Sequence, residues 1–434
     1  MHRLPRVVEL RPSTLRGSAS VPGSKSYTHR ALLASLLARG RSLVENPLWS
    51  SDTLATLSAV EALGASVEQG SGGLMVESPG AGGLRWTPCI DAAESGTTMR
   101  LVTGVLGLLG DTVLVYGRGR LHERPVRPLL EAMARLGVSY LLSRGCCPPH
   151  AVRGPASGGE TVVDAGESSQ YLSALLLLGA GLGGLEVGVE RLESRPYVDI
   201  TVRVLEAYGA RVERRGYEWF RVAGEPRPSR FRVPGDWSTA AQLIAAVAAA
   251  GGSVVLQGLD PDDPQPDRRV VEILREAGAS CRLGAGSASC SSPGPGGLRG
   301  FEACISDSPD LAPALAAVAA VACGVTRICC VERLRLKESD RLEAVLDLAR
   351  RAGATARATT REGRLCVEIR GRCGPARPAS YSSHGDHRVA MAAAALALAS
   401  TGPSRVEGAD TVAKSFPGFW ETLRRLGASV EAKS

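Results

Sequence analysis

Arg127-Pro128-Leu129-Leu130-Glu131-Ala132-Met133-Ala134-Arg135-Leu136-Gly137-Val138 contains the pattern that decides the fold. Apolar residues recur at helical spacing up to residue 136, a glycine then ends the predicted helix, and a strand-like run follows. The same junction recurs every 69–75 residues, at Gly64, Gly137, Gly209, Gly278, Gly353 and Gly427. The sequence therefore predicts six copies of one supersecondary unit.

A second landmark recurs at nearly the same period: a short polar cluster followed by a strongly apolar helix. The clusters begin near Ser24, Glu94, Glu167, Asp236, Asp307 and Asp386. The helices predicted after them, such as 31–38, 171–180, 240–250 and 389–399, are apolar nearly all round and should be buried. Each repeat should thus hold one buried helix and one surface helix such as 127–136 or 268–277, with strands such as 112–116, 253–257 and 326–331 between them.

Six repeats suggest two domains of three repeats each. The last repeat stops soon after Gly427, and the residues before Pro22 precede the first polar cluster. We therefore expect an N-terminal strand to complete the second domain. The predicted boundaries are 18–233 for the first domain, and 1–17 with 234–434 for the second.

Composition excludes several classes of protein. The formal charge of +7 is spread along the chain with few aromatic residues between the basic ones, which argues against a nucleic-acid surface. The longest apolar run, 171–185, is too short to span a bilayer, so a soluble, cytoplasmic protein is expected. Eleven cysteines show no metal-ligand spacing and no C-x-x-C motif. Reduced, mostly buried thiols and no metal are the expectation.

Lysine is almost absent from this chain. Lys25, Lys337, Lys414 and Lys433 are the only lysines, although Lys and Arg together number 51. An ammonium is compact and can lose its proton when desolvated, whereas a guanidinium stays charged. Lysines that survive such a bias are candidates for proton transfer or phosphate binding, and three of the four lie in polar clusters.

The polar clusters have two interpretations. The N-termini of buried helices carry unpaired N–H groups and a partial positive charge, which together favour anions. Any one cluster can equally be an ordinary helix cap. Likewise, Glu338 and Arg341 could form a solvated helical ion pair, and His387 could be a capping or core histidine.

Taken together, the clusters resemble the 5-enolpyruvylshikimate-3-phosphate synthase family over essentially the whole chain. The matching motifs, in order, are Gly23-Ser24-Lys25-Ser26 with Arg30, Ser95-Gly96-Thr97 with Arg100, Glu123-Arg124-Pro125, Ser168-Ser169-Gln170, Ser194 to Tyr197, Lys337-Glu338-Ser339-Asp340-Arg341, Asp386-His387-Arg388 and Lys414-Ser415-Phe416-Pro417. The resemblance implies two inside-out α/β domains, each of three βαβαββ repeats, with the active site in the interdomain cleft.

The resemblance also implies a reaction. The family moves the carboxyvinyl group of phosphoenolpyruvate to the 5-hydroxyl of shikimate 3-phosphate by addition and elimination, releasing phosphate, in the shikimate pathway to aromatic amino acids. By resemblance Asp310 is the base, Glu338 is the acid, and Lys25 lies close by. The implied protein is a monomer that needs no cofactor and binds these two small molecules, and glyphosate would compete with phosphoenolpyruvate near Gly96.

The same resemblance implies two sets of binding residues. Shikimate 3-phosphate would contact Lys25, Ser26, Arg30, Ser168, Ser169, Gln170, Ser194, Tyr197, Asp310 and Lys337. Phosphoenolpyruvate would contact Lys25, Gly96, Arg124, Gln170, Arg341, His387, Arg388 and Lys414.

Two positions depart from the family pattern: Glu94 stands where the family commonly has asparagine, and Arg333 where it often does. Two other functions are alternatives. A sister enzyme that uses UDP-N-acetylglucosamine has a Lys-Asn start and a reactive cysteine in its first domain, whereas this chain has Lys25-Ser26 and no cysteine between Cys89 and Cys146. A noncatalytic RNA-associated protein would not explain the acid and base at Asp310 and Glu338.

Overall fold

The computed structural model describes residues 4–433 and divides the chain into two compact units. We call Gly23–Pro234 the middle unit, and the segment up to Pro22 together with the chain from Gly235 onward the terminal unit. The chain thus changes unit after Pro22 and Pro234, not after residues 17 and 233. A change after residue 17 would cut β2 (Leu15–Ser20), which pairs along its length with β15 (Gly252–Gln257) in the terminal unit.

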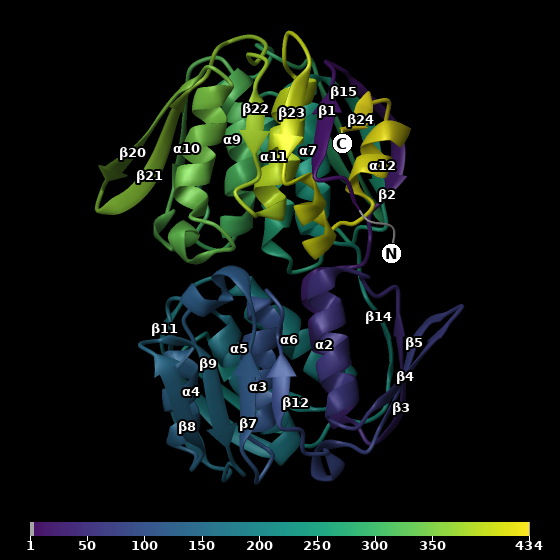
Figure 1. Cartoon of the computed structure of the whole chain (residues 1–434), viewed down its shortest axis with the longest axis vertical. Helices are drawn as coiled ribbons and strands as arrows, with labels where there is room; N and C mark the ends of the chain where they lie inside the picture. The colour runs from purple at the N-terminus through teal and green to yellow at the C-terminus, as the bar shows by residue number, and fades with distance from the viewer. Residues whose placement is uncertain (1–3, 434) are drawn as a thin grey trace. The chain divides into compact units, whose positions relative to one another are not determined.

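The middle unit is built around three buried helices, which contact one another and are buried over nearly their whole length. Two of them are rich in alanine and leucine, which favour helix, whereas the helix that begins at Gly96 has no alanine and is built largely from threonine, valine and leucine. Three further helices bury one face and expose the other. Figure 1 shows the helices and sheets of the unit. The buried helices are α1 (Lys25–Leu37), α3 (Gly96–Leu106) and α5 (Gln170–Leu182), and the surface helices are α2 (Ser51–Ala62), α4 (Arg127–Ala134) and α6 (Pro196–Ala207).

The terminal unit repeats this plan. Its buried helices are α7 (Trp237–Ala250), α9 (Ala312–Val321) and α11 (His387–Leu398), and its surface helices are α8 (Val270–Glu276), α10 (Arg341–Arg351) and α12 (Phe419–Arg425). Within residues 4–433 we find no helix with the length and apolar character needed to cross a membrane.

The described chain forms six four-stranded sheets. In each sheet, with its strands named below in spatial order, the first two strands pair in parallel and the other pairs are antiparallel. The middle unit holds β14 (Arg230–Arg232), β3 (Gly40–Glu45), β5 (Gly73–Ser78) and β4 (Ser66–Gly70); β6 (Cys89–Asp91), β7 (Val113–Tyr116), β9 (Cys147–Arg153) and β8 (Ser139–Arg144); and β10 (Glu160–Ala165), β11 (Gly184–Leu192), β13 (Trp219–Ala223) and β12 (Arg211–Arg215). The terminal unit holds β2, β15, β17 (Ser287–Ser292) and β16 (Ser280–Gly284); β18 (Glu302–Cys304), β19 (Val325–Cys329), β21 (Arg364–Arg370) and β20 (Thr355–Arg361); and β22 (Ser380–Ser382), β23 (Ser404–Glu407), β1 (Val7–Leu10) and β24 (Val430–Lys433).

Each sheet and its two helices form one βαβαββ repeat, as in β6, α3, β7, α4, β8 and β9. The inside-out α/β fold is therefore confirmed. Where the chain changes unit, the order is permuted: β2 precedes α1 in sequence but pairs with β15, and β14 precedes α7 but pairs with β3. In the sixth repeat β1 takes the place of the last strand, between β23 and β24.

The six repeat glycines all adopt the left-handed backbone conformation, with φ between 86° and 105°. Each follows a surface helix and precedes the next strand or loop. A side chain with a Cβ atom is strained in this region, so glycine is the residue that lets the chain leave the helix. This constraint explains the period seen in the sequence.

The expectation of reduced thiols is wrong. Among the described residues, disulfides join Cys281 to Cys290, Cys304 to Cys330, Cys323 to Cys373 and Cys329 to Cys366, all in the terminal unit, while Cys89, Cys146 and Cys147 are free. Strand pairing brings the partners together, since Cys281 lies opposite Cys290 and Cys329 opposite Cys366. Linear spacing does not reveal which strands are neighbours, so these pairings could not be predicted from the sequence.

We predict that the N-terminal strand contributes strongly to the stability of the terminal unit. Leu10 is fully buried between Ser404 and Val430, so Leu10→Ala should lower the free energy of unfolding by about 2–5 kcal/mol. Urea denaturation followed by circular dichroism measures this loss. Arg11→Ala, at a side chain that is 57% exposed, is the control, and an equally small effect of both changes would contradict the role of β1.

Candidate active site

In both units the predicted polar clusters lie at the start of buried helices. In the middle unit the Ser95 side chain accepts a hydrogen bond from the Thr98 backbone N–H and caps α3. In the terminal unit Asp236 and Asp386 cap α7 and α11 in the same way. Each cap satisfies one or two of the free N–H groups of a helix start, so the remaining groups can face an anion.

Lys25 is the first residue of α1 and forms an ion pair within the middle unit. Its Nζ lies 2.8 Å from Oδ2 of Asp52, in the first turn of α2, and both side chains are about nine-tenths buried. Asp52 was not predicted, because it lies between the recognised motifs. The pair fixes the ammonium at the start of a buried helix.

Gly96 and Arg124 pack directly on each other. A Cβ atom at Gly96 would lie 2.4 Å from both Cζ and Nη1 of Arg124, which is far closer than atoms can approach. Glycine is therefore required for the guanidinium to rest on the start of α3. The result is a cation held against free helix N–H groups, which is an arrangement suited to a phosphate or carboxylate.

Gln170, at the start of α5, is oriented by two neighbours. Arg100 Nη1 donates to its side-chain oxygen at 2.9 Å, and its amide nitrogen donates to the Thr97 hydroxyl at 2.8 Å. Burial lowers the pKa of Arg100 to about 10, so the guanidinium remains charged at neutral pH. The Gln170 amide is thus held in one orientation by α3.

Arg30 is a buried link rather than an exposed cation. Its Nε donates to the Thr201 hydroxyl at 2.6 Å, and its Nη atoms donate to the Ser26 and Tyr197 carbonyls at 2.9 and 3.2 Å and to the Ser173 hydroxyl at 3.2 Å. Burial lowers its pKa to about 10. The structure therefore gives Arg30 a positioning contact with Ser26 and Tyr197, two of the expected binding residues.

Of the four expected serines, Ser26 lies in the first turn of α1, and the other three lie near the starts of α5 and α6. The Ser168 hydroxyl accepts from the Gln170 backbone N–H at 3.3 Å, and Ser169 is the N-cap residue of α5. Ser194 adopts a left-handed backbone conformation, with φ of 55°, just before α6. The strained conformation at Ser194 is of the kind that functional sites often retain.

In the terminal unit, Arg341 binds three carboxylates. Its Nη1 lies 2.6 Å from Asp310, its Nη2 lies 2.6 Å from Glu338, and its Nε lies 2.9 Å from Asp386. The Arg341 side chain has no exposed surface. Burial alone would lower the pKa of Arg341, but Asp386, Glu338 and Asp310 raise it above its usual range. The predicted ion pair of Glu338 with Arg341 exists, but it is buried rather than solvated.

Asp310 receives two further cations. Arg388 Nη2 lies 2.8 Å from one of its oxygens, and Lys337 Nζ lies 3.7 Å from the other. Burial would raise the pKa of Asp310, but Arg388, Lys337 and Arg341 hold it well below its usual range. Burial lowers the pKa of Lys337 to about 8, and Asp310 opposes this shift.

His387, Asp267 and Lys414 complete the terminal cluster. The His387 side chain is fully buried, with Nδ1 3.9 Å from Asp386 Oδ1. Asp267 is 1% exposed, and burial followed by the charge of Asp310 raises its pKa to about 7. Lys414 Nζ donates to the Gly385 carbonyl at 3.0 Å, just before α11.

The expected site residues therefore form one cluster in each unit. The middle cluster holds Lys25, Ser26, Arg30, Gly96, Arg124, Ser168, Ser169, Gln170, Ser194 and Tyr197, and the terminal cluster holds Asp310, Lys337, Glu338, Arg341, His387, Arg388 and Lys414. Sequence reasoning missed Asp52 and Asp267 as members and the organising roles of Arg100 and Asp386. Asp386 and Arg100 stood in recognised motifs, whereas nothing local marked Asp52 or Asp267.

The repeats and these clusters define a class of protein. Lysines, arginines and helix starts suit substrates that carry phosphate and carboxylate groups, and the buried carboxylates supply groups for proton transfer. These functional groups are those expected of a group-transfer enzyme that acts on anionic substrates.

Comparison with known proteins gives the particular family. The family model described as EPSP synthase (3-phosphoshikimate 1-carboxyvinyltransferase) matches residues 10–423. The 3-phosphoshikimate 1-carboxyvinyltransferase of Aeropyrum pernix is 47% identical over 430 residues, covering 99% of this chain and 98% of the relative, and that of Methanopyrus kandleri is 42% identical over 429 residues, covering 96% and 97%. A solved EPSP synthase structure from Acinetobacter baumannii superposes with a TM-score of 0.80 at 28% identity, covering 99% of this chain and all of the other. The chain belongs to the EPSP synthase family.

The pKa of Lys337 generates a prediction. With Lys337 protonated below about pH 8, its ammonium can attract an anionic substrate, and above that pH the attraction is lost. We expect kcat/KM for shikimate 3-phosphate to fall as the pH rises through about 8, since kcat/KM reports groups of the free enzyme. Lys337→Arg, which stays charged, should remove this decline even if its overall rate is lower. The same decline in both proteins would contradict the assignment to Lys337.

Proposed function

We propose that the two clusters perform the reaction of the family, the transfer of the carboxyvinyl group of phosphoenolpyruvate to the 5-hydroxyl of shikimate 3-phosphate with release of phosphate. The observation that carries the proposal is the buried Arg341, which pairs with both Asp310 and Glu338, while Arg388 and Lys337 pair with Asp310 as well. Two proton-transfer groups and three cations in one cluster match a reaction between two anions.

Each substrate is assigned its own set of contacts, and both sets contain cations because both substrates are anions. Shikimate 3-phosphate is assigned to Lys25, Ser26, Arg30, Ser168, Ser169, Gln170, Ser194, Tyr197, Asp310 and Lys337, and phosphoenolpyruvate to Lys25, Gly96, Arg124, Gln170, Arg341, His387, Arg388 and Lys414. Because the structure buries Arg30 and His387, these two would act mainly by orienting Ser26, Tyr197 and the start of α11.

Addition comes first in the proposed mechanism. Asp310 takes the proton of the 5-hydroxyl as its oxygen attacks C2 of phosphoenolpyruvate, and Glu338 gives a proton to C3, which becomes a methyl group. In the elimination, Glu338 takes a proton back from that methyl group, the C2–C3 double bond reforms, and phosphate leaves with the electrons of its C–O bond. Lys25 stabilises the negative charge near the attacking oxygen.

Substrate binding would also prepare the base. In the structure Arg388, Lys337 and Arg341 make Asp310 a weak base by holding its pKa low. When the phosphate and carboxylate groups of the substrates engage these cations, Asp310 loses part of their attraction and its pKa rises. The carboxylate would therefore become a stronger base only when both anions are bound.

The expected monomeric state, cytoplasmic location and lack of a cofactor stay predictions.

Glu94 is exposed at the start of α3, and Arg333 donates a hydrogen bond to the Ser306 carbonyl. These two departures from the family pattern thus have different consequences: Glu94 adds a charge near Gly96, whereas Arg333 gains a contact within its own unit.

A phosphate-release assay tests the proposal. Wild-type protein should release phosphate with shikimate 3-phosphate and not with UDP-N-acetylglucosamine. Glu338→Gln and Lys25→Met should each lower kcat at least about a hundredfold, because each removes a titratable group from the reaction. Glu343→Gln, an exposed glutamate in the first turn of α10, is the matched control and should leave kcat unchanged. Near-normal turnover by Glu338→Gln would refute its role as the acid.

Gly96→Ala should weaken phosphoenolpyruvate binding. The new methyl group would displace the Arg124 guanidinium, which is the flexible end of a side chain and can move without unfolding α3. We expect KM for phosphoenolpyruvate to rise about tenfold and the inhibition constant of glyphosate to rise at least as much, as measured by initial-rate kinetics. Unchanged values for both would show that neither ligand uses Arg124, and glyphosate inhibition that does not depend on phosphoenolpyruvate concentration would show that the two do not compete.

A further inference from the structure

Two separate stretches of the terminal unit carry the proposed base and acid. Cys304 ends β18 and precedes Asp310 by six residues, while Cys330 follows β19 and precedes Glu338 by eight residues. A disulfide joins Cys304 to Cys330, with their Cα atoms 5.5 Å apart, a usual separation for such a bond. The cross-link therefore joins the N-terminal ends of the two stretches.

Noncovalent contacts connect the same two stretches at two further positions. Arg333 donates to the Ser306 carbonyl, and Arg341 and Lys337 pair with Asp310. The disulfide is the one covalent bond among these contacts. It limits how far the N-terminal end of one stretch can move relative to that of the other. Such a movement would change the distance between Asp310 and Glu338.

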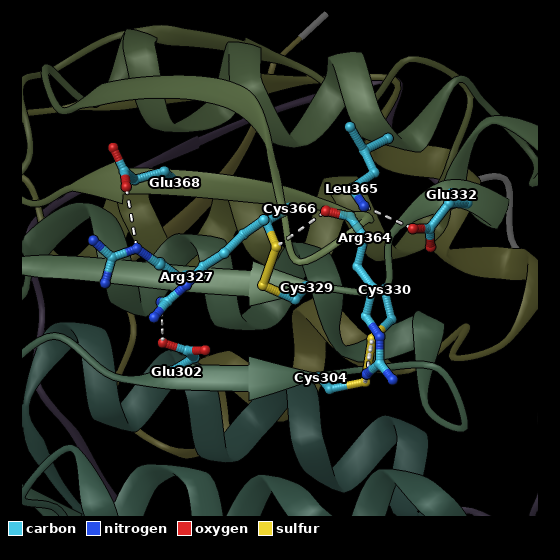
Figure 2. Close-up of a disulfide and its surroundings, with 11 residues drawn as sticks. Glu302, Cys304, Arg327, Cys329, Cys330, Glu332, Arg364, Leu365, Cys366 and Glu368 are labelled. Atoms are coloured by element: carbon cyan, nitrogen blue, oxygen red, sulfur yellow. Dashed lines mark hydrogen bonds and ion pairs between the residues drawn. A yellow bond between two sulfur atoms is a disulfide. The ribbon is translucent and has the colours of Figure 1, made fainter.

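The surroundings of this disulfide differ from those of the other three. Cys304 and Cys330 are both partly exposed, and Arg364 Nη1 lies 3.9 Å and 3.7 Å from their sulfur atoms (Figure 2). The disulfides Cys281–Cys290 and Cys329–Cys366 are buried. The second joins β19 to β21, as Figure 2 shows. A guanidinium beside a sulfur stabilises the thiolate, and a stabilised thiolate is the better leaving group in thiol–disulfide exchange.

We propose that Cys304–Cys330 is a positioning cross-link for the reaction, and that a dithiol reductant opens it in preference to the other disulfides. A thiolate of the dithiol attacks one sulfur, the Sγ–Sγ bond breaks, and the other cysteine leaves as a thiolate beside Arg364. The second thiol of the reductant then displaces the first cysteine and closes a cyclic disulfide. Two electrons and two protons pass from the dithiol to the protein, which gains two thiols.

The inference rests on the proposed roles of Asp310 and Glu338. Opening the cross-link should lower kcat about tenfold, because small misplacements of reacting groups are costly, while KM for either substrate changes less than about twofold. If the bond had only a structural role, opening it would lower the stability of the protein but would not lower kcat selectively while KM stays nearly unchanged. Reoxidation should restore the original kcat.

The experiment titrates the oxidised wild-type protein with dithiothreitol, alkylates the new thiols and locates them by mass spectrometry, with activity measured at each step. We expect Cys304 and Cys330 to be labelled first and the loss of kcat to follow their labelling. The partly exposed Cys323–Cys373 pair is an internal control for accessibility, since Cys373 is exposed. Equal labelling of both pairs, or full kcat with Cys304 and Cys330 labelled, would overturn the proposal.

Variants separate the two parts of the inference. Arg364→Gln should slow reduction of Cys304–Cys330 at least about threefold and leave the kcat of the oxidised protein unchanged, because the thiolate loses its cation. Arg361→Gln, which removes a neighbouring guanidinium paired with Glu302, is the matched control and should leave the reduction rate unchanged. Equal rates in the Arg364 and Arg361 variants would contradict the role of Arg364.

The double change Cys304→Ser and Cys330→Ser should match the reduced wild-type protein in kcat. If that variant does not fold, selective reduction of the wild-type protein gives the same answer. Failure of the proposed function is recognised separately: oxidised wild-type protein would then release no phosphate with shikimate 3-phosphate, whereas failure of the cross-link proposal leaves that activity intact and insensitive to reduction.

Discussion

The ion pairs of the buried Arg341 guanidinium with three carboxylates are the interaction on which the active-site cluster of the terminal unit depends. The Arg341 side chain has no exposed surface, and three carboxylates from three different segments pair with it. Removing one partner from a buried ion pair typically costs about 3–5 kcal/mol, because the remaining charge is left uncompensated. The cluster therefore keeps Asp310, Glu338 and Asp386 together even though 76 residues of sequence separate the first from the last.

A fold with helices inside and sheets outside makes such clusters possible. The buried helices of the terminal unit are composed largely of alanine and leucine, so their sides can pack without polar partners. Their N-termini cannot be apolar, because the first N–H groups of a helix need partners. The polar residues of each repeat are consequently concentrated at helix starts, where side chains from different repeats of the same unit meet.

The two units follow one plan but differ in how they are reinforced. In the described part of the chain the four disulfides lie in the terminal unit, whereas the middle unit has free cysteines and hydrogen-bonded links such as those of Arg30 and Arg100. The proposed acid and base both belong to the terminal unit. Covalent restraint is thus found in the unit that holds the proposed acid and base, whereas hydrogen bonds organise the cluster of the middle unit.

The repeat could be predicted without any structure. Glycines that must adopt positive φ and helices without a polar face are local requirements, so Gly64, Gly137 and their counterparts predicted six repeats of strands and helices. The motifs at the helix starts indicated the family, and the βαβαββ plan followed from that resemblance. Only the tertiary structure decided the pairing of Lys25 with Asp52, the three partners of Arg341, the burial of Asp267 and the four disulfides. These features depend on which strands and helices become neighbours across long separations, and no local pattern of residues encodes that choice.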